Sequence, residues 1–164
     1  MGIKAQNGDW IIGTSPVARG SKLVYAMQVA ETLSFDQYFA DVRFGEKKPV
    51  INGSWKEQCG DNMYSKNAQG QWIQGPTIHH REPELVEKDL KHPTVFIANH
   101  YYYFGDKASV IPAEFKTLVL NRQGCKKDFD AKIVKMFVNW LTNNFKPGIQ
   151  GNPSDQEECK SDCS

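Results

Sequence analysis

The sequence has almost no net charge, although it is rich in charged residues. It holds 20 lysines and arginines against 19 aspartates and glutamates, for a formal net charge of +1. A protein that grips a long duplex through its backbone usually carries a basic excess, because phosphate neutralisation supplies much of the affinity. The missing excess argues against that class, so any nucleic-acid partner is expected to be a single base or a small nucleotide.

Long apolar runs and targeting signals are also missing. No run approaches the roughly 20 apolar residues of a membrane span, and no signal peptide is recognised. Gln6 stands where a myristoylation signal needs Ser or Thr. The four cysteines are scattered and no secretory signal accompanies them, which predicts a reduced, cytoplasmic protein. Cys159 and Cys163 could bind metal or form a disulfide, but two free thiols in a frayed polar tail are favoured.

The common enzyme signatures are absent as well. There is no Walker loop, no dinucleotide-binding glycine motif, no nucleophile elbow, and no zinc-protease or zinc-deaminase pattern. Their absence argues against these common enzyme classes but does not exclude catalysis. His79 and His80 invite a metal interpretation, but adjacent residues rarely reach one ion and no further ligand falls at the right spacing. The sequence therefore predicts neither a metal nor a cofactor.

The composition that remains describes one ordinary globular domain. The chain has 164 residues, of which 40% are hydrophobic and 24% charged, which is enough for a real core. No repeat or low-complexity tract divides it. We expect a single domain over residues 1–150 and a polar flexible tail over residues 151–164.

The first third of the chain predicts a hairpin followed by a helix. Trp10–Ile12 and Lys22–Thr32 are β-prone, and they are joined by a loop containing proline and glycine. Ser34 can cap a helix, with Gln37 three residues later in capping-box register. Val42 is expected on the apolar side of this helix.

The remaining segments give a mixture of strands, one long loop and a helix. Residues 51–83 are rich in Gly, Asn, Gln and Trp, which predicts an irregular stretch with short strands around Met63-Tyr64 and Trp72-Ile73. "IPAEFKTLVLN" fits either a short helix or a strand. A final helix, capped by Asp128 and ended by "KPG", is expected to lie across the sheet.

The clearest predicted strand spans residues 95–104. Alternation places Tyr101 and Tyr103 on one face, with Tyr102 and Phe104 on the other. One face is expected to fill the core and the other to border a pocket. The pattern alone leaves open which face does which.

The densest set of polar and aromatic groups lies between residues 60 and 80. Asp61 and Asn62 follow a glycine in a predicted turn, and the Asn amide offers the donor and acceptor needed to read a base edge. Tyr64 and Trp72 offer flat faces for stacking, and His79 can act in acid–base chemistry. For each residue alone a structural role is favoured, as part of a turn, of the core or of a loop. The cluster as a whole favours function.

A second candidate lies in "GTS", where Thr14 and Ser15 end the first strand. Such a loop can bind phosphate through its amides. It can equally begin the hairpin turn, and that alternative is favoured.

Several segments together resemble a known family. They are "GDWIIGTS", "LVYAMQVAETLSFDQYFADVRF", "GDNMY", "GQWIQ", His79 and "YYYFGDKASVIP". They resemble the bacterial and phage nucleotide modification associated domain of the second type, from about Gly8 to the final helix. The resemblance implies association with DNA base modification or phage–host conflict, and therefore a location in the cytoplasm of a bacterial or phage-infected cell.

The opening hairpin is also similar to the PUA-like group, which includes the EVE and ASCH domains. This similarity implies an α+β fold, a small bent mixed β-barrel with flanking helices, that holds a base in an aromatic pocket. Two features depart from the pattern. His80 stands where family members often have a hydroxyl residue, and little chain precedes Gly8 to form the first barrel strand.

Three functions are compatible with these residues. The leading one is a module that binds a nucleotide or a modified nucleobase, or DNA carrying one. The second is an enzyme acting on a nucleotide or DNA base, with His79 as acid or base and Asp61 orienting it or positioning water. The third is a protein-interaction domain with an aromatic contact patch. The expected ligand-binding residues are Thr14, Ser15, Asp61, Asn62, Tyr64, Trp72, His79, Tyr101, Tyr103 and Phe104.

Overall fold

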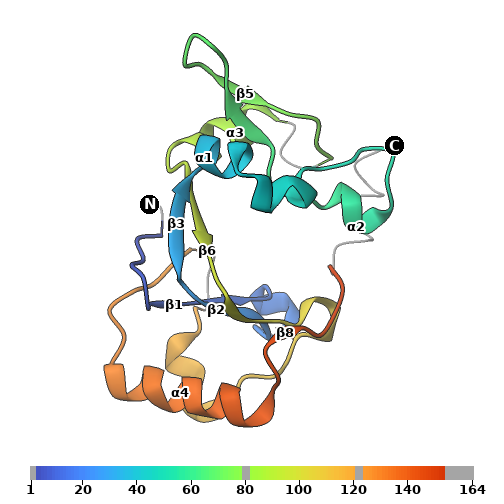
Figure 1. Ribbon diagram of the computed structural model, residues 1–164. Helices are drawn as coiled ribbons and strands as arrows, with labels where there is room; N and C mark the ends of the chain where they lie inside the picture. Colours follow the sequence, from blue (N-terminus) through green and yellow to red (C-terminus); the bar gives the residue numbers. More distant parts are fainter. Residues whose placement is uncertain (1–2, 79–81, 121–123, 154–164) are drawn as a thin grey trace. The chain divides into compact units, whose positions relative to one another are not determined.

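The computed structural model describes residues 3–78, 82–120 and 124–153 (Figure 1). Helices and strands are mixed along these residues, so the α+β class expected from the sequence is confirmed. Backbone contacts divide the chain into two compact units. Unit 1 contains residues up to Ala30 and from Ala98 to Asn152, and unit 2 is formed chiefly by Glu31–Ile97. In the described ranges no helix is long and apolar enough to cross a membrane.

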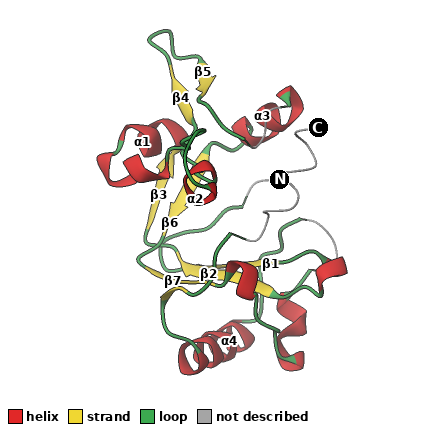
Figure 2. Ribbon diagram, turned by 90° about the vertical axis from the view of Figure 1, so that its right-hand side faces the viewer, coloured by secondary structure: helices red, strands yellow, loops and turns green. Residues whose placement is uncertain are grey.

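Unit 1 is built on a four-stranded sheet in the order β1-β2-β7-β8. The strands β1 and β2 form the expected antiparallel hairpin, β2 pairs antiparallel with β7, and β7 pairs parallel with the short β8. Helix α4 covers one face of this sheet (Figures 1 and 2). The elements are β1 (Trp10–Thr14), β2 (Leu23–Gln28), β7 (His100–Tyr103), β8 (Gly148–Ile149), α4 (Ala131–Asn144) and the 3₁₀ helices η1 (Val17–Arg19), η3 (Gly105–Lys107) and η4 (Ala113–Leu118).

The core of unit 1 lies between the sheet and its helices. It buries aliphatic and aromatic side chains from β2, β7, η4 and α4, which is the main favourable contribution to folding. The segment "IPAEFKTLVLN" takes the helical alternative, as η4. The buried residues are Leu23, Ala26, Tyr102, Phe104, Ile111, Phe115, Leu118, Phe137 and Leu141.

Helix α4 begins two residues later than the sequence indicates. Asp130 is its N-cap, because its carboxylate accepts hydrogen bonds from the amides of Lys132 at 2.7 Å and Ile133 at 3.4 Å. Asp128, the expected cap, has a left-handed backbone with φ of 63° and precedes the helix. The prediction of the cap residue was therefore wrong, although the helix itself is confirmed.

Unit 2 contains two separate pairs of strands. Strands β3 and β6 pair antiparallel, and so do β4 and β5, which form a hairpin that extends away from α1 (Figure 2). The stretch expected to be irregular carries helix α2, and helix α3 follows it. The elements are β3 (Glu31–Ser34), β4 (Tyr64–Lys66), β5 (Trp72–Gln74), β6 (Thr94–Ile97), α1 (Phe35–Ala40), α2 (Trp55–Gln58), α3 (Pro83–Leu90) and the 3₁₀ helix η2 (Val42–Lys47).

The N-terminus of α1 has the predicted capping box. The Ser34 amide donates to Oε1 of Gln37 at 2.9 Å, and the Gln37 amide donates to Oγ of Ser34 at 3.4 Å. The helix is shorter than expected, since it ends at Ala40 and Asp41 caps η2. Val42 consequently starts a new helix and is 93% exposed, so its predicted place on a buried face was wrong.

Two strands that the sequence predicts as continuous are each interrupted. The segment 22–32 forms β2 and β3, and the segment 95–104 forms β6 and β7. In both cases the two halves belong to different sheets. None of the three sheets of the described chain closes into a barrel. The expected mixture of helices and strands is therefore present, but the small bent β-barrel expected from the PUA-like similarity is not formed by these sheets.

Candidate functional site

Four side chains of unit 2 form an aromatic surface that we call the hairpin face: Phe35, Tyr64, Lys66 and Trp72. The pairing of β4 with β5 places Tyr64 opposite Gln74 and Lys66 opposite Trp72. Residues opposite each other in a sheet project to the same side. Ser65 and Ile73 form the remaining pair, on the other side of the hairpin.

The rings of the hairpin face contact one another. The Phe35 and Tyr64 rings are stacked, with centroids 5.2 Å apart and an interplanar angle of 12°. Phe35 meets Trp72 edge-on, at 6.2 Å and 76°. The Lys66 ammonium lies over the Trp72 ring, 4.7 Å from its centroid. The Trp72 ring is therefore held by Phe35 and covered in part by a cation.

Tyr64 is the buried member of this surface. It is 4% exposed, and its hydroxyl donates a hydrogen bond to Oδ2 of Asp89 on α3 at 2.9 Å. Burial raises the pKa of Tyr64 well above its usual value, and the bond to the Asp89 carboxylate raises it further. Tyr64 is thus the buried, hydrogen-bonded part of the hairpin face, whereas Trp72 is half-buried.

Asp61 and Asn62 lie just before β4, where they bind α1 and η2. The Tyr38 hydroxyl donates to Oδ1 of Asp61 at 2.9 Å. The Asn62 amide nitrogen donates to the carbonyl oxygens of Tyr38 at 3.2 Å and Phe44 at 3.1 Å. A side chain at Gly60 would overlap the backbone at Lys47. The "GDN" sequence therefore fastens this segment to α1 and η2.

The buried Asn62 side chain is only partly satisfied. It is 1% exposed, and within the described residues its Oδ1 has no hydrogen-bond partner. The two carbonyl acceptors fix the orientation of the amide, because only the NH₂ group can donate to them. Burying an acceptor without a donor costs free energy. Within the described residues, Oδ1 of Asn62 is the buried side-chain atom of the "GDN" segment that lacks a hydrogen bond.

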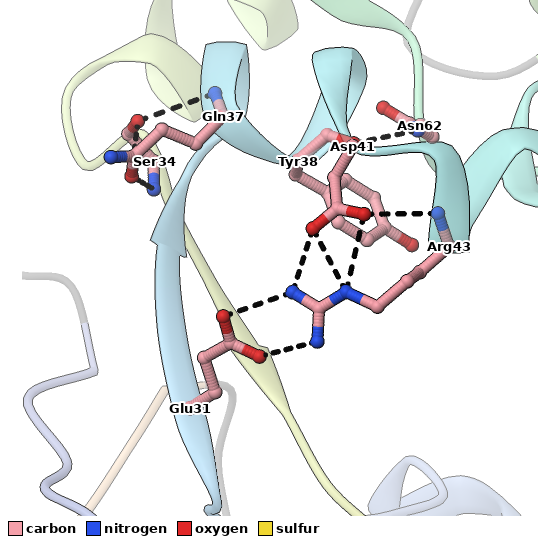
Figure 3. A network of polar contacts seen from close by, with 7 residues as sticks. All are labelled: Glu31, Ser34, Gln37, Tyr38, Asp41, Arg43 and Asn62. Carbon is pink, nitrogen blue, oxygen red and sulfur yellow. Dashed lines mark hydrogen bonds and ion pairs between the residues drawn. The ribbon is translucent and has the colours of Figure 1, made fainter.

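An ion-pair network lies on the surface beside Tyr38 (Figure 3). The Arg43 guanidinium lies between two carboxylates, donating to Glu31 at 2.8 Å and 3.0 Å and to Asp41 at 2.6 Å, 2.9 Å and 3.1 Å. These bonds join β3 to η2. They lower the pKa values of both the Glu31 and Asp41 carboxyl groups, chiefly through hydrogen bonding to Arg43.

The remaining candidates belong to unit 1. Ser15 serves its own loop, since its Oγ accepts from the Lys22 amide at 2.9 Å and donates to the Arg19 carbonyl at 3.4 Å. Thr14 ends β1 at an irregularity in the register, opposite Leu23. These contacts agree with the turn alternative for "GTS".

The structure shows which face of β7 enters the core. Tyr102 and Phe104 are core residues, 1% and 2% exposed, and the Phe104 ring meets Phe145 edge-on at 4.8 Å. Tyr101 and Tyr103 lie on the opposite face of the sheet. A ligand contact with Phe104 would require the core of unit 1 to open.

On the face of β7 that carries Tyr101 and Tyr103, neighbouring side chains come from β2, and the sequence did not single them out. Tyr25 lies opposite Tyr103, and Met27 lies opposite Tyr101. A side chain at Gly13 would overlap the Tyr25 ring, which extends over β1. Burial raises the pKa of Tyr25 above its usual value. The glycine of "GTS" therefore has a packing role beneath this ring.

The expected site residues fall in both units. Asp61, Asn62, Tyr64 and Trp72 belong to unit 2, whereas Thr14, Ser15, Tyr101, Tyr103 and Phe104 belong to unit 1. His79 and His80 lie outside the described residues, as do Cys159 and Cys163. Within the described ranges, no group of three or more His, Cys, Asp or Glu side chains could hold a metal ion.

Sequence reasoning missed Phe35 and Lys66 on the hairpin face. A signal for Lys66 existed in the turn between the strands. The Asn67 amide donates to the Gln71 carbonyl at 2.9 Å, and Gly70 takes a left-handed φ of 77°. A turn closed between Asn67 and Gln71 sets Lys66 directly opposite Trp72. Nothing local indicates Phe35, which precedes Tyr64 by a long stretch of chain.

These features define a small α+β protein with a hairpin that carries a partly open tryptophan. Over residues 3–160 the chain matches the family model described as nucleotide modification associated domain 2. It belongs to this family, as the resemblance in its sequence predicts. No curated protein and no solved structure gives a significant match.

Proposed function

We propose that the chain binds a nucleotide or a modified nucleobase, free or within DNA, and that Trp72 supplies the stacking surface. The family description supports the nucleotide class. The observation that carries the proposal is the Trp72 ring itself, half-buried, held by Phe35 and covered on its face by the Lys66 ammonium. The aromatic face is thus held in place by its neighbours and is covered by a lysine, whose side chain has a flexible stem.

A fixed ring of this kind suits a nucleobase. Every base has a flat π-face, and stacking on an aromatic side chain contributes about 1–3 kcal/mol per base. Holding the ring in place beforehand reduces the entropy lost when the ligand binds. The stack of Phe35 on Tyr64 and the Tyr64 bond to Asp89 supply that support.

The charge balance of the chain supports a small ligand. With a formal net charge of +1, the protein has no general attraction for a polyanion. A base held by stacking and edge hydrogen bonds needs few phosphate contacts. A PUA-like relationship and a link to DNA modification or phage–host conflict are consistent with this ligand and stay predictions.

The test is a single substitution with a matched control. Trp72→Ala removes the half-buried ring, and Ile73→Ala removes an apolar side chain that is 46% exposed on the other side of the same strand. Tyr64 is a poor choice, because its buried ring and hydroxyl bond also stabilise unit 2. Calorimetry with the common nucleoside 5′-monophosphates and their base-methylated forms would identify the best-binding ligand.

Loss of stacking in Trp72→Ala should then reduce the affinity for that ligand by about 5- to 150-fold. Ile73→Ala should bind as the wild type does. Equal affinity of Trp72→Ala and wild type for the best-binding ligand would refute the stacking role. Native mass spectrometry of protein purified from its host provides an independent readout, since a nucleotide-binding module is expected to carry co-purified nucleotide.

A further inference from the structure

Lys66 is an exposed cation that lies against the ring of the candidate site. It lies directly across the β4–β5 hairpin from Trp72, and its ammonium rests over the ring, 4.7 Å from the centroid. In the described part of the chain no carboxylate pairs with it, in contrast to the two carboxylates that bind Arg43. Among the described residues the Lys66 ammonium therefore contacts the Trp72 ring and no carboxylate, so its charge is available to an anion.

The same contact makes Lys66 the displaceable neighbour of the ring. Phe35 is fixed by its stack on Tyr64, which is in turn bonded to α3. Lys66 has a flexible four-carbon stem and a strongly hydrated head. When a flat group approaches the face that Lys66 covers, the lysine can leave without disturbing the packing of unit 2.

We infer that Lys66 occupies the Trp72 face in the free protein and moves to the phosphate of the bound ligand, so that the ligand is a nucleoside phosphate rather than a free base or nucleoside. This inference rests on the proposed binding at Trp72. A stacked base displaces the ammonium from its ring. A phosphate attached to that base through the sugar then lies within the reach of the same side chain and restores a partner for its charge.

If Lys66 binds the phosphate, the protein should prefer nucleoside monophosphates over nucleosides, and this preference should depend on the Lys66 charge. Adenosine, guanosine, cytidine and thymidine would be compared with their 5′-monophosphates by calorimetry, at low and at high salt. The wild type should bind the best monophosphate at least about tenfold more tightly than its nucleoside, and salt should reduce this preference. Lys66→Met keeps an unbranched apolar stem and should abolish the preference while leaving nucleoside affinity equal or improved.

A matched control exists in unit 1. Lys126 also places its ammonium 4.7 Å from the centroid of an aromatic ring, that of Phe129. Lys126→Met should therefore retain the phosphate preference. Equal binding of nucleoside and monophosphate by the wild type would overturn the inference, and so would an unchanged preference in Lys66→Met.

The Trp72→Ala variant separates the two proposals. If it binds nucleoside and monophosphate as the wild type does, the stacking proposal fails, and the inference about Lys66 fails with it. If Trp72→Ala loses both ligands while Lys66→Met keeps the phosphate preference, stacking is supported and only the role of Lys66 is rejected.

Discussion

The Tyr38 hydroxyl donates a hydrogen bond to Oδ1 of Asp61 over 2.9 Å, joining α1 to the segment that leads into β4. Asp61 was considered from sequence as the residue that would orient an acid–base histidine. In the structure its carboxylate already has a partner, and that partner is a buried tyrosine. A catalytic role for Asp61 would have to share or break this bond.

The first prediction concerns the tyrosines at high pH. Burial raises the pKa values of Tyr25, Tyr38, Tyr64 and Tyr102, and the Asp61 charge adds to the effect at Tyr38. For an acidic group with a raised folded pKa, the stabilisation is complete below the unfolded value of about 10 and is lost as the pH rises above it. Four of the six tyrosines should therefore resist ionisation past pH 10.

Ultraviolet titration of tyrosinate, followed together with circular dichroism, checks this prediction. In denaturant all the tyrosines should titrate near pH 10. In the folded protein the four shifted groups should ionise together with unfolding, and Tyr38→Phe should remove one of them from that late phase. Complete titration near pH 10 with an unchanged dichroism spectrum would contradict the prediction.

Local signals in the sequence were reliable where neighbouring residues determine the structure. The Ser34–Gln37 capping box needs only residues three apart, and the alternation in β7 needs only its own side chains. The cap of α4 was misjudged because Asp128 and Asp130 are equally good capping residues. The choice depends on where the chain enters the helix, which the capping rules do not encode.

Features set by distant contacts could not be read from the sequence. The alternation of residue types continues through Val29–Ala30 and Ala98–Asn99, where the strands are in fact interrupted. The sequence singles out Tyr64 as a candidate stacking residue, but Tyr64 is buried because Phe35 and Asp89 lie against it. Those contacts come from parts of the chain far from Tyr64, so no local pattern reveals them.

The second prediction concerns the "FGDK" motif, which the structure explains by packing. The amide of Asp106 donates to the Asn152 carbonyl at 2.9 Å, and its Oδ1 accepts from the Asn152 amide at 2.8 Å. Gly105 has a left-handed φ of 53°, and a Cβ there would overlap the Asn152 carbonyl. Gly105→Ala should therefore lower the free energy of unfolding by about 2 kcal/mol or more, from backbone strain and overlap together.

Urea denaturation of Gly105→Ala would measure this loss. Gly45→Ala is the matched control, because no atom lies within 4 Å of a Cβ at that position. The control should stay within about 0.5–1 kcal/mol of the wild type. An equally small effect at Gly105 would show that Asn152 can move away at little cost.

The third prediction concerns acid. Hydrogen bonds from Arg43 lower the pKa values of Glu31 and Asp41. A carboxyl with a lowered folded pKa contributes stability that is complete above its unfolded value of about 4 and is lost as the pH falls through the folded value. The contribution should be small and reduced by salt, because the network is exposed.

Thermal midpoints measured as a function of pH below about 4 would reveal this contribution. Arg43→Met should lose the part of the acid dependence that salt suppresses. Lys91→Met serves as control, because it breaks only a single 3.5 Å pair with Glu87. If the Arg43→Met curve coincides with that of the wild type, the network has no role in acid stability.

The last prediction concerns the buried amide of the "GDN" segment. In Asn62→Ala the carbonyl oxygens of Tyr38 and Phe44 lose their donor in a site that is 1% exposed. Each such loss costs about 1–3 kcal/mol, and removal of the unpaired Oδ1 offsets part of the total. We expect a net loss of about 2 kcal/mol or more by urea denaturation. Asn62→Asp should lose more stability than Asn62→Ala, since a carboxylate would face two carbonyl oxygens and could not donate to either.

Asn99→Ala, at an exposed position, is the control and should change stability by less than about 0.5 kcal/mol. A stable Asn62→Asp would mean that the amide is not needed to fasten the "GDN" segment to α1 and η2.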